Sequence, residues 1–285
     1  MPGTLFVVAT PIGNLEDLTF RALRTLREVD LIAAEDTRRT AKLLTHYEVH
    51  KPMVSLREHN ESRETPKLLD RIAAGESIAL VSDAGTPGIA DPGARLVRAA
   101  HERGLPVVPI PGPSAVAAAL SVSGFSGDQF VFAGFPPPSG SARQLWLKDL
   151  SLEARAVIFF EAPHRIRRTL EQVGATLVGR HIFLARELSK KFEQLVVSPI
   201  KSQLTVSDLG EFTVIVGPSP GTSADPATIA GDVVALFGRL TNNVPLSDDE
   251  AVGIVSKVFS VDERVVKKAV KKARILVNNQ KQSSA

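Results

Sequence analysis

Ser82-Asp83-Ala84-Gly85-Thr86-Pro87-Gly88-Ile89-Ala90-Asp91-Pro92-Gly93 is the segment of this 285-residue chain that says most about its fold. It directly follows the apolar run 78–81, which predicts a buried strand, and it leads into a helix expected from Asp91 to Gly104. Its three glycines permit positive φ and a close approach of ligand atoms, while its two prolines stiffen the backbone. The segment therefore predicts a rigid, backbone-lined binding loop at the carboxyl end of a strand.

The first 115 residues alternate short apolar runs with helical patterns. A helix is expected from Thr65-Pro66 to Gly75, because Pro favours the first helical turn and Gly the end. This alternation predicts βαβ units around a mostly parallel sheet. In open α/β sheets, ligands bind where the strands end. The strands expected in this first domain, residues 1–115, are 5–9, 31–34, 53–56, 78–81 and 105–110.

The second half predicts a further α/β domain and a helical tail. Residues 116–217 hold a Pro-rich loop or hinge after residue 135 and a helix that starts near Pro163. Residues 218–226 have the composition of a linker. Residues 227–285 predict a small helical module with Val265, Val266 and Val270 facing inward. The strands expected in the second domain are 130–135, 156–160, 182–185, 195–197 and 212–216.

Composition limits the class of protein. The chain is 44% hydrophobic and 23% charged, as ordinary globular proteins are, and it contains no cysteine. The lack of cysteine excludes a disulfide framework, a thiolate metal site and a cysteine nucleophile. Every apolar run is far shorter than the roughly 18 residues of a membrane span. The N-terminus also lacks the features of a signal peptide, so we expect a cytoplasmic protein.

The net charge of +3 is unevenly distributed. From Val261 to the end, seven basic residues stand against two acidic ones, so the tail carries +5 and the remainder −2. The pairs Lys267/Lys268 and Lys271/Lys272 lie four residues apart, on one outer helix face. This pattern suits an anionic partner larger than a cofactor, and it suits a simply solvated helix face equally well.

Several common site patterns are missing from the sequence. It has no G-x-G-x-x-G after the first expected strand and no G-x-x-x-x-G-K-[ST], which disfavours dehydrogenases and NTPases. It has no G-x-S-x-G, so a triad hydrolase is unsupported. The six histidines show no metal-ligand spacing, and we expect no metal site.

Seven blocks between Thr4 and Val216 carry a resemblance to a known family. They are Val8–Leu15 with Asp17, Ala34–Arg38, Ser82–Gly93, Pro111–Ala115, Phe160–Arg165, Ala185–Lys190 and Gly210–Phe212. Together they resemble the ribosomal RNA small subunit methyltransferase I family, a bacterial branch of the tetrapyrrole-methylase-like superfamily. Ala90 is one departure, because the family pattern has Ser or Asn there.

The resemblance implies a fold, a reaction and partners. The fold would be two α/β domains of tetrapyrrole-methylase type with the cofactor cleft between them, plus a small C-terminal helical module. The cofactor would be S-adenosylmethionine. The substrate would be 16S ribosomal RNA in the small ribosomal subunit, methylated on a cytidine ribose 2′-hydroxyl in the decoding region. The protein would be a homodimer.

The resemblance also assigns expected roles to residues. The catalytic base is left open among Glu35, Asp36, Glu161, Glu187 and Lys190. RNA contacts are expected from basic residues of the matching motifs, Arg38, Arg39, Arg165 and Arg186, and, on the charge of the tail helix, from Lys267, Lys268, Lys271 and Lys272. The expected cofactor-binding residues are Pro11, Gly13, Asp83, Ala84, Gly85, Pro87, Ile89, Ser114, Ala115, Phe160, Glu161, Ala162, Leu188 and Glu211.

Two other functions stay open on the sequence. A tetrapyrrole methyltransferase of the same superfamily would have no need of the basic tail, and its first turn would be richer in glycine than Ala9–Gly13. A non-enzymatic RNA-binding or subunit-assembly factor would have no reason to keep the Gly/Pro-rich loops. Binding of the cofactor by the purified protein distinguishes this last hypothesis from the others.

Overall fold

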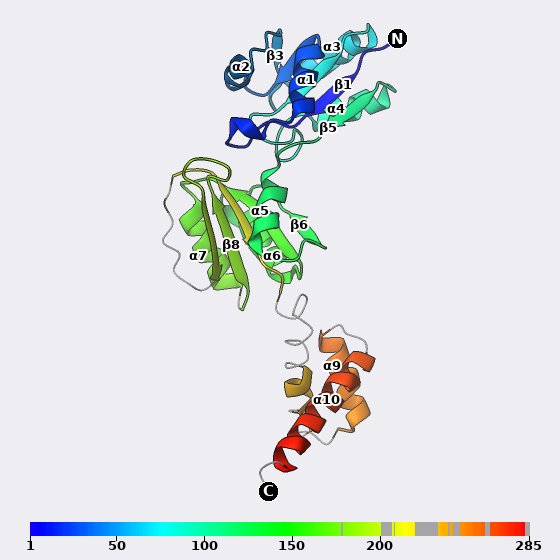
Figure 1. Ribbon diagram of the computed structural model, residues 1–285, viewed down its shortest axis with the longest axis vertical. Helices are drawn as coiled ribbons and strands as arrows, with labels where there is room; N and C mark the ends of the chain where they lie inside the picture. The colour runs from blue at the N-terminus through cyan, green and yellow to red at the C-terminus, as the bar shows by residue number, and fades with distance from the viewer. Residues whose placement is uncertain are drawn as a thin grey trace. The chain divides into compact units, whose positions relative to one another are not determined.

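The chain divides into two compact units, residues 1–217 and 218–285, in the computed structural model (Figure 1). The predicted boundary between two α/β domains at 115/116 lies within the first unit. The predicted linker, 218–226, lies outside the described residues from position 220 onward. The structure describes residues 1–177, 179–200, 207, 209–219, 233–238, 240–241, 246–259 and 263–282.

The first sheet is entirely parallel, as the alternating pattern predicted. Its strand order is β3-β2-β4-β1-β5, so β1 and β4 are neighbours at its middle. Each strand is a short apolar run that ends in a turn, which explains why the sequence located all five. The strands are β1 (Leu5–Val8), β2 (Leu31–Ala34), β3 (Met53–Ser55), β4 (Ile78–Val81) and β5 (Val107–Ile110).

Helices cover both faces of this sheet. Ala22 and Leu26 of α1 (Phe20–Glu28) share a core with Leu44 of α2 (Thr37–His46). On the opposite face, α3 (Glu61–Ala73) and α4 (Ala94–Glu102) pack their apolar residues together. The segment after β1 thus leads to α1 on one face of the sheet, and the segment after β4 leads to α4 on the opposite face. Such a divergence opens a crevice at the carboxyl ends of two adjacent strands.

The second sheet is mixed, with the order β6-β7-β10-β8-β9. Only the β6–β7 pair is parallel among these neighbours, and the other three pairs are antiparallel. Its central strand β10 is buried along its whole length. The strands are β6 (Phe130–Phe132), β7 (Ala156–Glu161), β8 (His181–Arg186), β9 (Gln194–Pro199) and β10 (Phe212–Val216).

Alternating residues of β7 serve the two faces of this second sheet. Val157 and Phe159 pack with α6 (Gly140–Leu152) and α7 (Ile166–Thr176). Ala156 and Ile158 pack with Val116 and Ala119 of α5 (Ala115–Ser123). The helix α5 therefore belongs to the second sheet by its packing, although it directly follows the last strand of the first.

The second unit is helical, as predicted. Val233 and Phe237 of the helical segment 233–238 share a core with α9 (Asp248–Phe259) and α10 (Glu263–Gln282). Ser247 caps α9 through reciprocal hydrogen bonds with Glu250. None of the described helices combines the length and hydropathy that crossing a bilayer requires.

Three details differ from the sequence-based expectations. The helix α3 begins at Glu61, one turn before the predicted Thr65, so Pro66 lies inside it. Glu61 and Glu64 favour this earlier start, because acidic side chains suit the first turn of a helix. Helix α6 was not predicted, because it buries only Arg143 and Leu150 and so lacks a regular apolar face. Val265 of α10 is 49% exposed, while Val266 and Val270 face inward as predicted.

Candidate active site

The loops after β1 and β4 are joined at the carboxyl edge of the first sheet. The backbones of Thr10 and Gly85 pair through two hydrogen bonds of 2.9 and 3.0 Å. The buried Thr10 hydroxyl also donates to the carbonyl of Ser82 at 3.2 Å. These bonds satisfy polar groups that the ends of the strands leave open, and they fix the start of the binding loop.

The rest of the Ser82–Gly93 loop is held in an unusual backbone conformation. Gly85 and Gly88 both have φ of +80°, Gly93 has φ of +124°, and Ala90 has φ of +64°. Glycine adopts positive φ without cost, whereas alanine does not. The departure at Ala90 therefore falls where Asn, a residue tolerated at positive φ, would be less strained.

A pocket of about 500 Å³ lies against this loop. Residues of the first sheet's loops, including Asp83 and Ile89, form part of its wall. Phe160 and Thr213 of the second sheet also line it, so both α/β parts of the first unit build the pocket. A volume of this size suits a cofactor or another small ligand.

Most of the predicted cofactor-binding residues line this pocket. The structure places Pro11, Gly13 and Pro87 outside its lining. Gly13 instead allows a close approach, because a Cβ there would lie 2.9 Å from the carbonyl oxygen of Leu188 and in contact with Lys190. The predicted residues on the wall are Asp83, Ala84, Gly85, Ile89, Ser114, Ala115, Phe160, Glu161, Ala162, Leu188 and Glu211.

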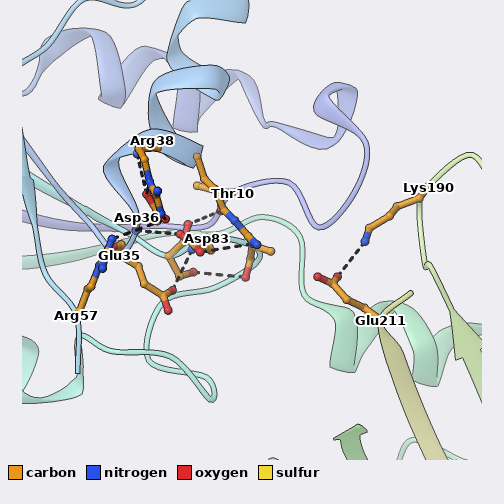
Figure 2. Close-up of polar contacts among 11 residues, drawn as sticks. Thr10, Glu35, Asp36, Arg38, Arg57, Asp83, Lys190 and Glu211 are labelled. Atoms are coloured by element: carbon orange, nitrogen blue, oxygen red, sulfur yellow. Dashed lines mark hydrogen bonds and ion pairs between the residues drawn. The ribbon is translucent and has the colours of Figure 1, made fainter. Parts of the chain in front are cut away.

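The carboxylate of Asp36 binds the N-terminus of α2 and the side chains of two arginines (Figure 2). Its carboxylate accepts a hydrogen bond from the Arg38 backbone N–H at 2.9 Å and so caps the helix. The side chain of Arg38 contacts the same carboxylate at 2.7 Å, and Arg57 lies at 3.7 Å. Hydrogen bonds from Arg38 hold the pKa of Asp36 well below its usual range. Asp36 thus has a structural role at this site.

Glu161 is a buried residue of the pocket wall. Its carboxylate accepts hydrogen bonds from the Thr169 hydroxyl at 2.6 Å and the Ala162 backbone N–H at 2.8 Å. The guanidinium of Arg165 lies 2.9 Å away, and that of Arg143 lies 4.0 Å away. A buried carboxylate requires such partners. The network fixes the Phe160–Pro163 turn against the pocket.

Glu187, Lys190 and Glu211 form a second charged group near the pocket (Figure 2 shows Lys190 beside Glu211). The Lys190 ammonium lies 2.9 Å from the Glu187 carboxylate and 3.1 Å from that of Glu211. Burial lowers the pKa of Lys190, but its hydrogen bonds to the two carboxylates outweigh that effect and raise it overall. Lys190 is therefore a cation at neutral pH.

Glu35 and Asp91 are two further carboxylates on the pocket wall. Burial raises the pKa of Glu35, although a hydrogen bond from the Asp83 N–H opposes this. Burial raises the pKa of Asp91 to about 6, and the nearby charges of Glu35 and Asp83 add to the effect. Asp91 was not among the predicted site residues, because its neighbour Glu35 lies far away in the sequence.

The wall suits a small cationic ligand. Three carboxylates, those of Glu35, Asp83 and Asp91, come together there with a single lining arginine, Arg39. Arg39 lies 3.5 Å from Asp83. Apolar lining residues such as Ile12 and Phe135 supply a surface for an aromatic or aliphatic group. A sulfonium compound with a nucleoside part, such as S-adenosylmethionine, matches this combination of charge and apolar surface.

The predicted RNA-contacting residues fall into two groups. Arg38 and Arg39 have side chains 82% and 63% exposed, and Lys268, Lys271 and Lys272 are also exposed. Arg38 and Arg39 are paired with Asp36 and Asp83, and the other three residues also have partners within the protein. Arg165 is paired with buried Glu161, Arg186 donates to the Leu209 carbonyl at 2.6 Å, and Lys267 lies 3.0 Å from Asp249. Among the described residues, no three His, Cys, Asp or Glu side chains are arranged so that they could hold a metal ion.

Comparison with known proteins agrees with this architecture. Residues 4–203 match the family model of the tetrapyrrole (corrin/porphyrin) methylases. The "Ribosomal RNA small subunit methyltransferase I" of Haemophilus influenzae is 42% identical over 266 residues, which cover 91% of this chain and 93% of that protein. The protein of the same name from Pseudomonas aeruginosa is 49% identical over 199 residues, covering 70% of this chain and 71% of that protein.

A solved structure shares the fold. Uroporphyrin-III C-methyltransferase from Thermus thermophilus, complexed with S-adenosylhomocysteine, aligns with a TM-score of 0.54 and 17% identity. The alignment covers 75% of this chain and 96% of that one. At 17% identity this similarity shows only that the fold is shared. The two bacterial relatives, at 42% and 49% identity, assign the sequence to a narrower group within the family. The chain therefore belongs to the tetrapyrrole methylase family and, within it, to the ribosomal RNA small subunit methyltransferase I proteins.

Proposed function

We propose that this chain transfers a methyl group from S-adenosylmethionine to the ribose 2′-hydroxyl of a cytidine in the decoding region of 16S ribosomal RNA. The observation that carries the proposal is the 42% identity across 91% of the chain to a small-subunit methyltransferase I. The pocket supports this proposal, because residues of the family's motifs from both α/β parts of the first unit line it. A ribosomal substrate also implies activity in the cytoplasm.

The pocket's own residues suit this chemistry. The cofactor, when bound, supplies an electrophilic methyl group on a positively charged sulfur. The carboxylates of Glu35, Asp83 and Asp91 offset positive charge in the pocket. The loop 82–93 gives a rigid wall that orients the ligand, and Phe135 and Phe160 add apolar surface that a bound ligand can cover. Alignment and exclusion of water are the main demands of methyl transfer to a weak nucleophile.

Exposed basic side chains are proposed to contact the RNA backbone. Arg38 and Arg39 lie beside the pocket, Arg39 on its wall. Lys268, Lys271 and Lys272 of α10 supply a second basic surface. Each phosphate contact releases counterions and makes binding weaker as salt rises. Arg165 contributes less in this proposal, because its side chain is only 23% exposed and is paired with the buried carboxylate of Glu161. Arg186 and Lys267 are expected to contribute as Arg38 and Arg39 do, since a partner within the protein is common to all four.

We also propose that the protein is a homodimer. An apolar groove of about 880 Å³ lies on the first unit and is lined by residues such as Leu120, Phe125 and Phe130. Val122 nearby on α5 is 51% exposed. Exposed apolar surface of this kind favours contact between copies. Sedimentation equilibrium of the purified protein gives the oligomeric state directly, and a monomer at micromolar concentration contradicts this proposal.

Methyl transfer from radiolabelled S-adenosylmethionine tests the proposed reaction. The substrates are small ribosomal subunits that lack their native methylations, with naked 16S ribosomal RNA alongside. Label recovered as 2′-O-methylcytidine supports the proposal, and comparison of the two substrates shows whether assembled RNA is required. Cofactor binding without transfer to either substrate overturns it and points to a tetrapyrrole or another RNA. A protein that does not bind the cofactor would instead be an assembly factor.

A further inference from the structure

The outward side of α1 combines arginines with an exposed aromatic ring. The buried residues of this helix hold one side of it on the first sheet. With 3.6 residues per turn, Phe20, Arg24 and Arg27 fall on the side opposite to the buried one, and Arg21 flanks them. All four residues are exposed, and Phe20 is 93% exposed. The helix therefore presents positive charge and an aromatic face to whatever approaches it.

These arginines are available to an external anion. Within the part of the chain that the structure describes, Arg21, Arg24 and Arg27 form no ion pair with a carboxylate. Arg27 donates one hydrogen bond to the Tyr47 carbonyl at 3.1 Å, and a guanidinium has five N–H donors. Their positive charge is thus not neutralised within the fold, in contrast to that of Arg38 beside Asp36.

A hollow of about 280 Å³ lies beside the same helix. Arg21 and Arg24, one turn apart, both line it. Among the described residues of its lining, Glu28 has the only carboxylate, so the two guanidinium groups leave a net positive charge. The planar guanidinium matches the geometry of a phosphate group and binds it through paired N–H donors. The hollow therefore suits a phosphate held by Arg21 and Arg24.

The helix begins close to the methyl-transfer pocket. Ile12, in the loop after β1, lines the pocket, and Phe20 is the first residue of α1. The Ser189 hydroxyl donates to the carboxylate of Asp17, so the connecting segment is fixed to the second α/β part. From Phe20 the helix runs back along the sheet toward the start of β2, and Arg27 lies about 10 Å further along its axis. The arginines thus lead away from the pocket.

This combination of groups fits RNA better than a second copy of the chain. Guanidinium groups bind the phosphates of RNA, and an exposed aromatic ring stacks on an unpaired base. A two-fold contact between copies pairs a surface with itself, so it would bring the arginines of α1 against one another. Arg38 and Arg39 of α2, which packs on the same face of the sheet, extend the positive surface toward the pocket.

We propose that α1 is a docking helix for the substrate RNA, outside the methyl-transfer pocket. Arg21, Arg24 and Arg27 bind phosphates of the strand that flanks the target nucleotide, and Phe20 stacks on an unpaired base beside the pocket. The inference rests on the proposed function, because it assigns a further contact surface to the same substrate. Binding of the flanking strand positions the target ribose without any contact between α1 and the cofactor.

The double variant Arg21→Gln/Arg24→Gln tests the phosphate contacts. Its matched control is Arg95→Gln/Arg98→Gln, which removes two exposed arginines, also one turn apart, from α4 on the opposite face of the sheet. Filter binding gives the Kd of each full-length protein for undermethylated small subunits and for naked 16S ribosomal RNA across a salt series. We expect the α1 variant to raise the Kd about tenfold or more and to reduce the slope of log Kd against log salt by about 1.5. The control should change the Kd less than about twofold.

Phe20→Ala tests the stacking contact separately from charge. The Kd for RNA should rise about tenfold, because a stacked base loses its aromatic partner. The salt dependence should stay as in the wild type, since no charge is removed. In methyl transfer, both α1 variants should raise KM for the small subunit and leave kcat nearly unchanged. Calorimetric titration with S-adenosylhomocysteine should give the wild-type affinity for each variant.

Several results would overturn the inference. Equal RNA affinity in the Arg21/Arg24 variant and in its α4 control removes the docking role of α1. A loss of S-adenosylhomocysteine affinity that matches the loss of RNA affinity assigns the effect to the pocket. Phe20→Ala that turns a dimer into a monomer, with unchanged RNA affinity, makes α1 a protein interface instead. Wild-type protein that methylates RNA while the α1 variants match it leaves the proposed function intact, whereas wild-type protein that neither binds nor methylates any RNA removes both.

Discussion

The carboxylate of Glu61 accepts a hydrogen bond from the backbone N–H of Gly93, 32 residues further along the chain. The same oxygen accepts from the N–H groups of Arg95 and Leu96 at 3.0 and 3.3 Å. Gly93 is the N-cap of α4 and has no side chain to cap the helix itself. Glu61 of α3 therefore supplies the negative charge that a helix N-terminus favours, and it anchors the end of the binding loop.

Replacement of Glu61 should destabilise both the N-terminus of α4 and the end of the binding loop. We expect Glu61→Ala to lower the free energy of unfolding by about 2–3 kcal/mol, because three N–H groups lose a charged acceptor. Glu61→Gln keeps an oxygen acceptor and should lose about 1 kcal/mol. Urea denaturation measures both variants. Equal stability of Glu61→Ala and the wild type would show that water replaces the carboxylate without cost.

Ala90 offers a substitution of the opposite sign. Its φ of +64° is costly for a residue with a Cβ. We expect Ala90→Gly to raise the free energy of unfolding by about 1 kcal/mol, because relief of strain exceeds the added flexibility of the unfolded chain. Ala99→Gly, inside α4, is the matched control and should lower it by about 1 kcal/mol. If both variants lose stability, the positive φ at Ala90 carries no strain.

The sequence alone located most of this framework. Strands such as 78–81 are compact apolar runs bounded by turn residues, so local pattern is enough to find them. The Gly/Pro-rich loops likewise predicted where the pocket lies. Helix α6 was not predicted, because one of its buried residues, Arg143, is charged. The hydrogen-bond partners of Arg143, Gln172 and Thr169, lie on α7 and cannot be inferred from the local sequence. The antiparallel pairing of β8 with β9 and β10 was not predicted either, because strand direction depends on the tertiary path of the chain.

The individual roles of the carboxylates required the three-dimensional structure. Glu35, Asp36 and Glu161 look alike as acidic residues in motifs. Their partners, which decide whether each is free or committed, lie as much as 48 residues away, as Asp83 does from Glu35. The same limit applies to Asp91. Its neighbours in the sequence, Pro92 and Gly93, indicate the start of a helix, but they do not reveal that Glu35 lies close to it in the folded protein.

The raised pKa of Asp91 has a consequence for the stability of the fold. Its pKa is about 6 in the folded protein, against 3.8 for an unperturbed aspartate such as that of the unfolded chain. Between these values the folded state binds a proton that the unfolded state has lost, so its contribution to stability falls as pH rises through this window. Asp91→Asn should therefore be more stable than the wild type at pH 8, by about 1 kcal/mol once solvent screening is allowed for. The gain should disappear below about pH 4. Urea denaturation of both proteins across pH measures it, and a gain independent of pH would contradict this account.

Arg180 is a buried cation that donates to several backbone carbonyls. It contacts the carbonyl oxygens of Gly217, Glu153 and Arg155 at 2.6, 2.8 and 2.9 Å. Arg180→Ala should lower the free energy of unfolding by about 3 kcal/mol, since three acceptors lose a charged donor. Arg168→Ala, which removes an exposed arginine from α7, is the matched control and should stay within about 0.5 kcal/mol. Thermal or urea unfolding that fails to separate the two variants would contradict the structural role of Arg180.

Gly13 joins the first-strand turn to the segment that carries Leu188 and Lys190. A Cβ at this position would lie 2.9 Å from the Leu188 carbonyl oxygen and would also meet the Lys190 side chain. Gly13→Ala must therefore push these two segments apart, at a cost of about 1–3 kcal/mol. Because Leu188 and Ile12 both line the pocket, we expect the Kd for S-adenosylhomocysteine to rise about tenfold.

Gly238→Ala is the matched control for Gly13→Ala. Nothing lies within 4 Å of a Cβ added there, and it belongs to the helical segment 233–238 of the second unit. The added methyl should favour that helix by up to about 1 kcal/mol and leave S-adenosylhomocysteine binding unchanged. Calorimetric titration of both variants separates a local steric effect from a general response to Gly→Ala replacement. Unchanged affinity in Gly13→Ala would mean that the Leu188 segment moves aside without altering the pocket, and the close approach at Gly13 would then serve packing alone.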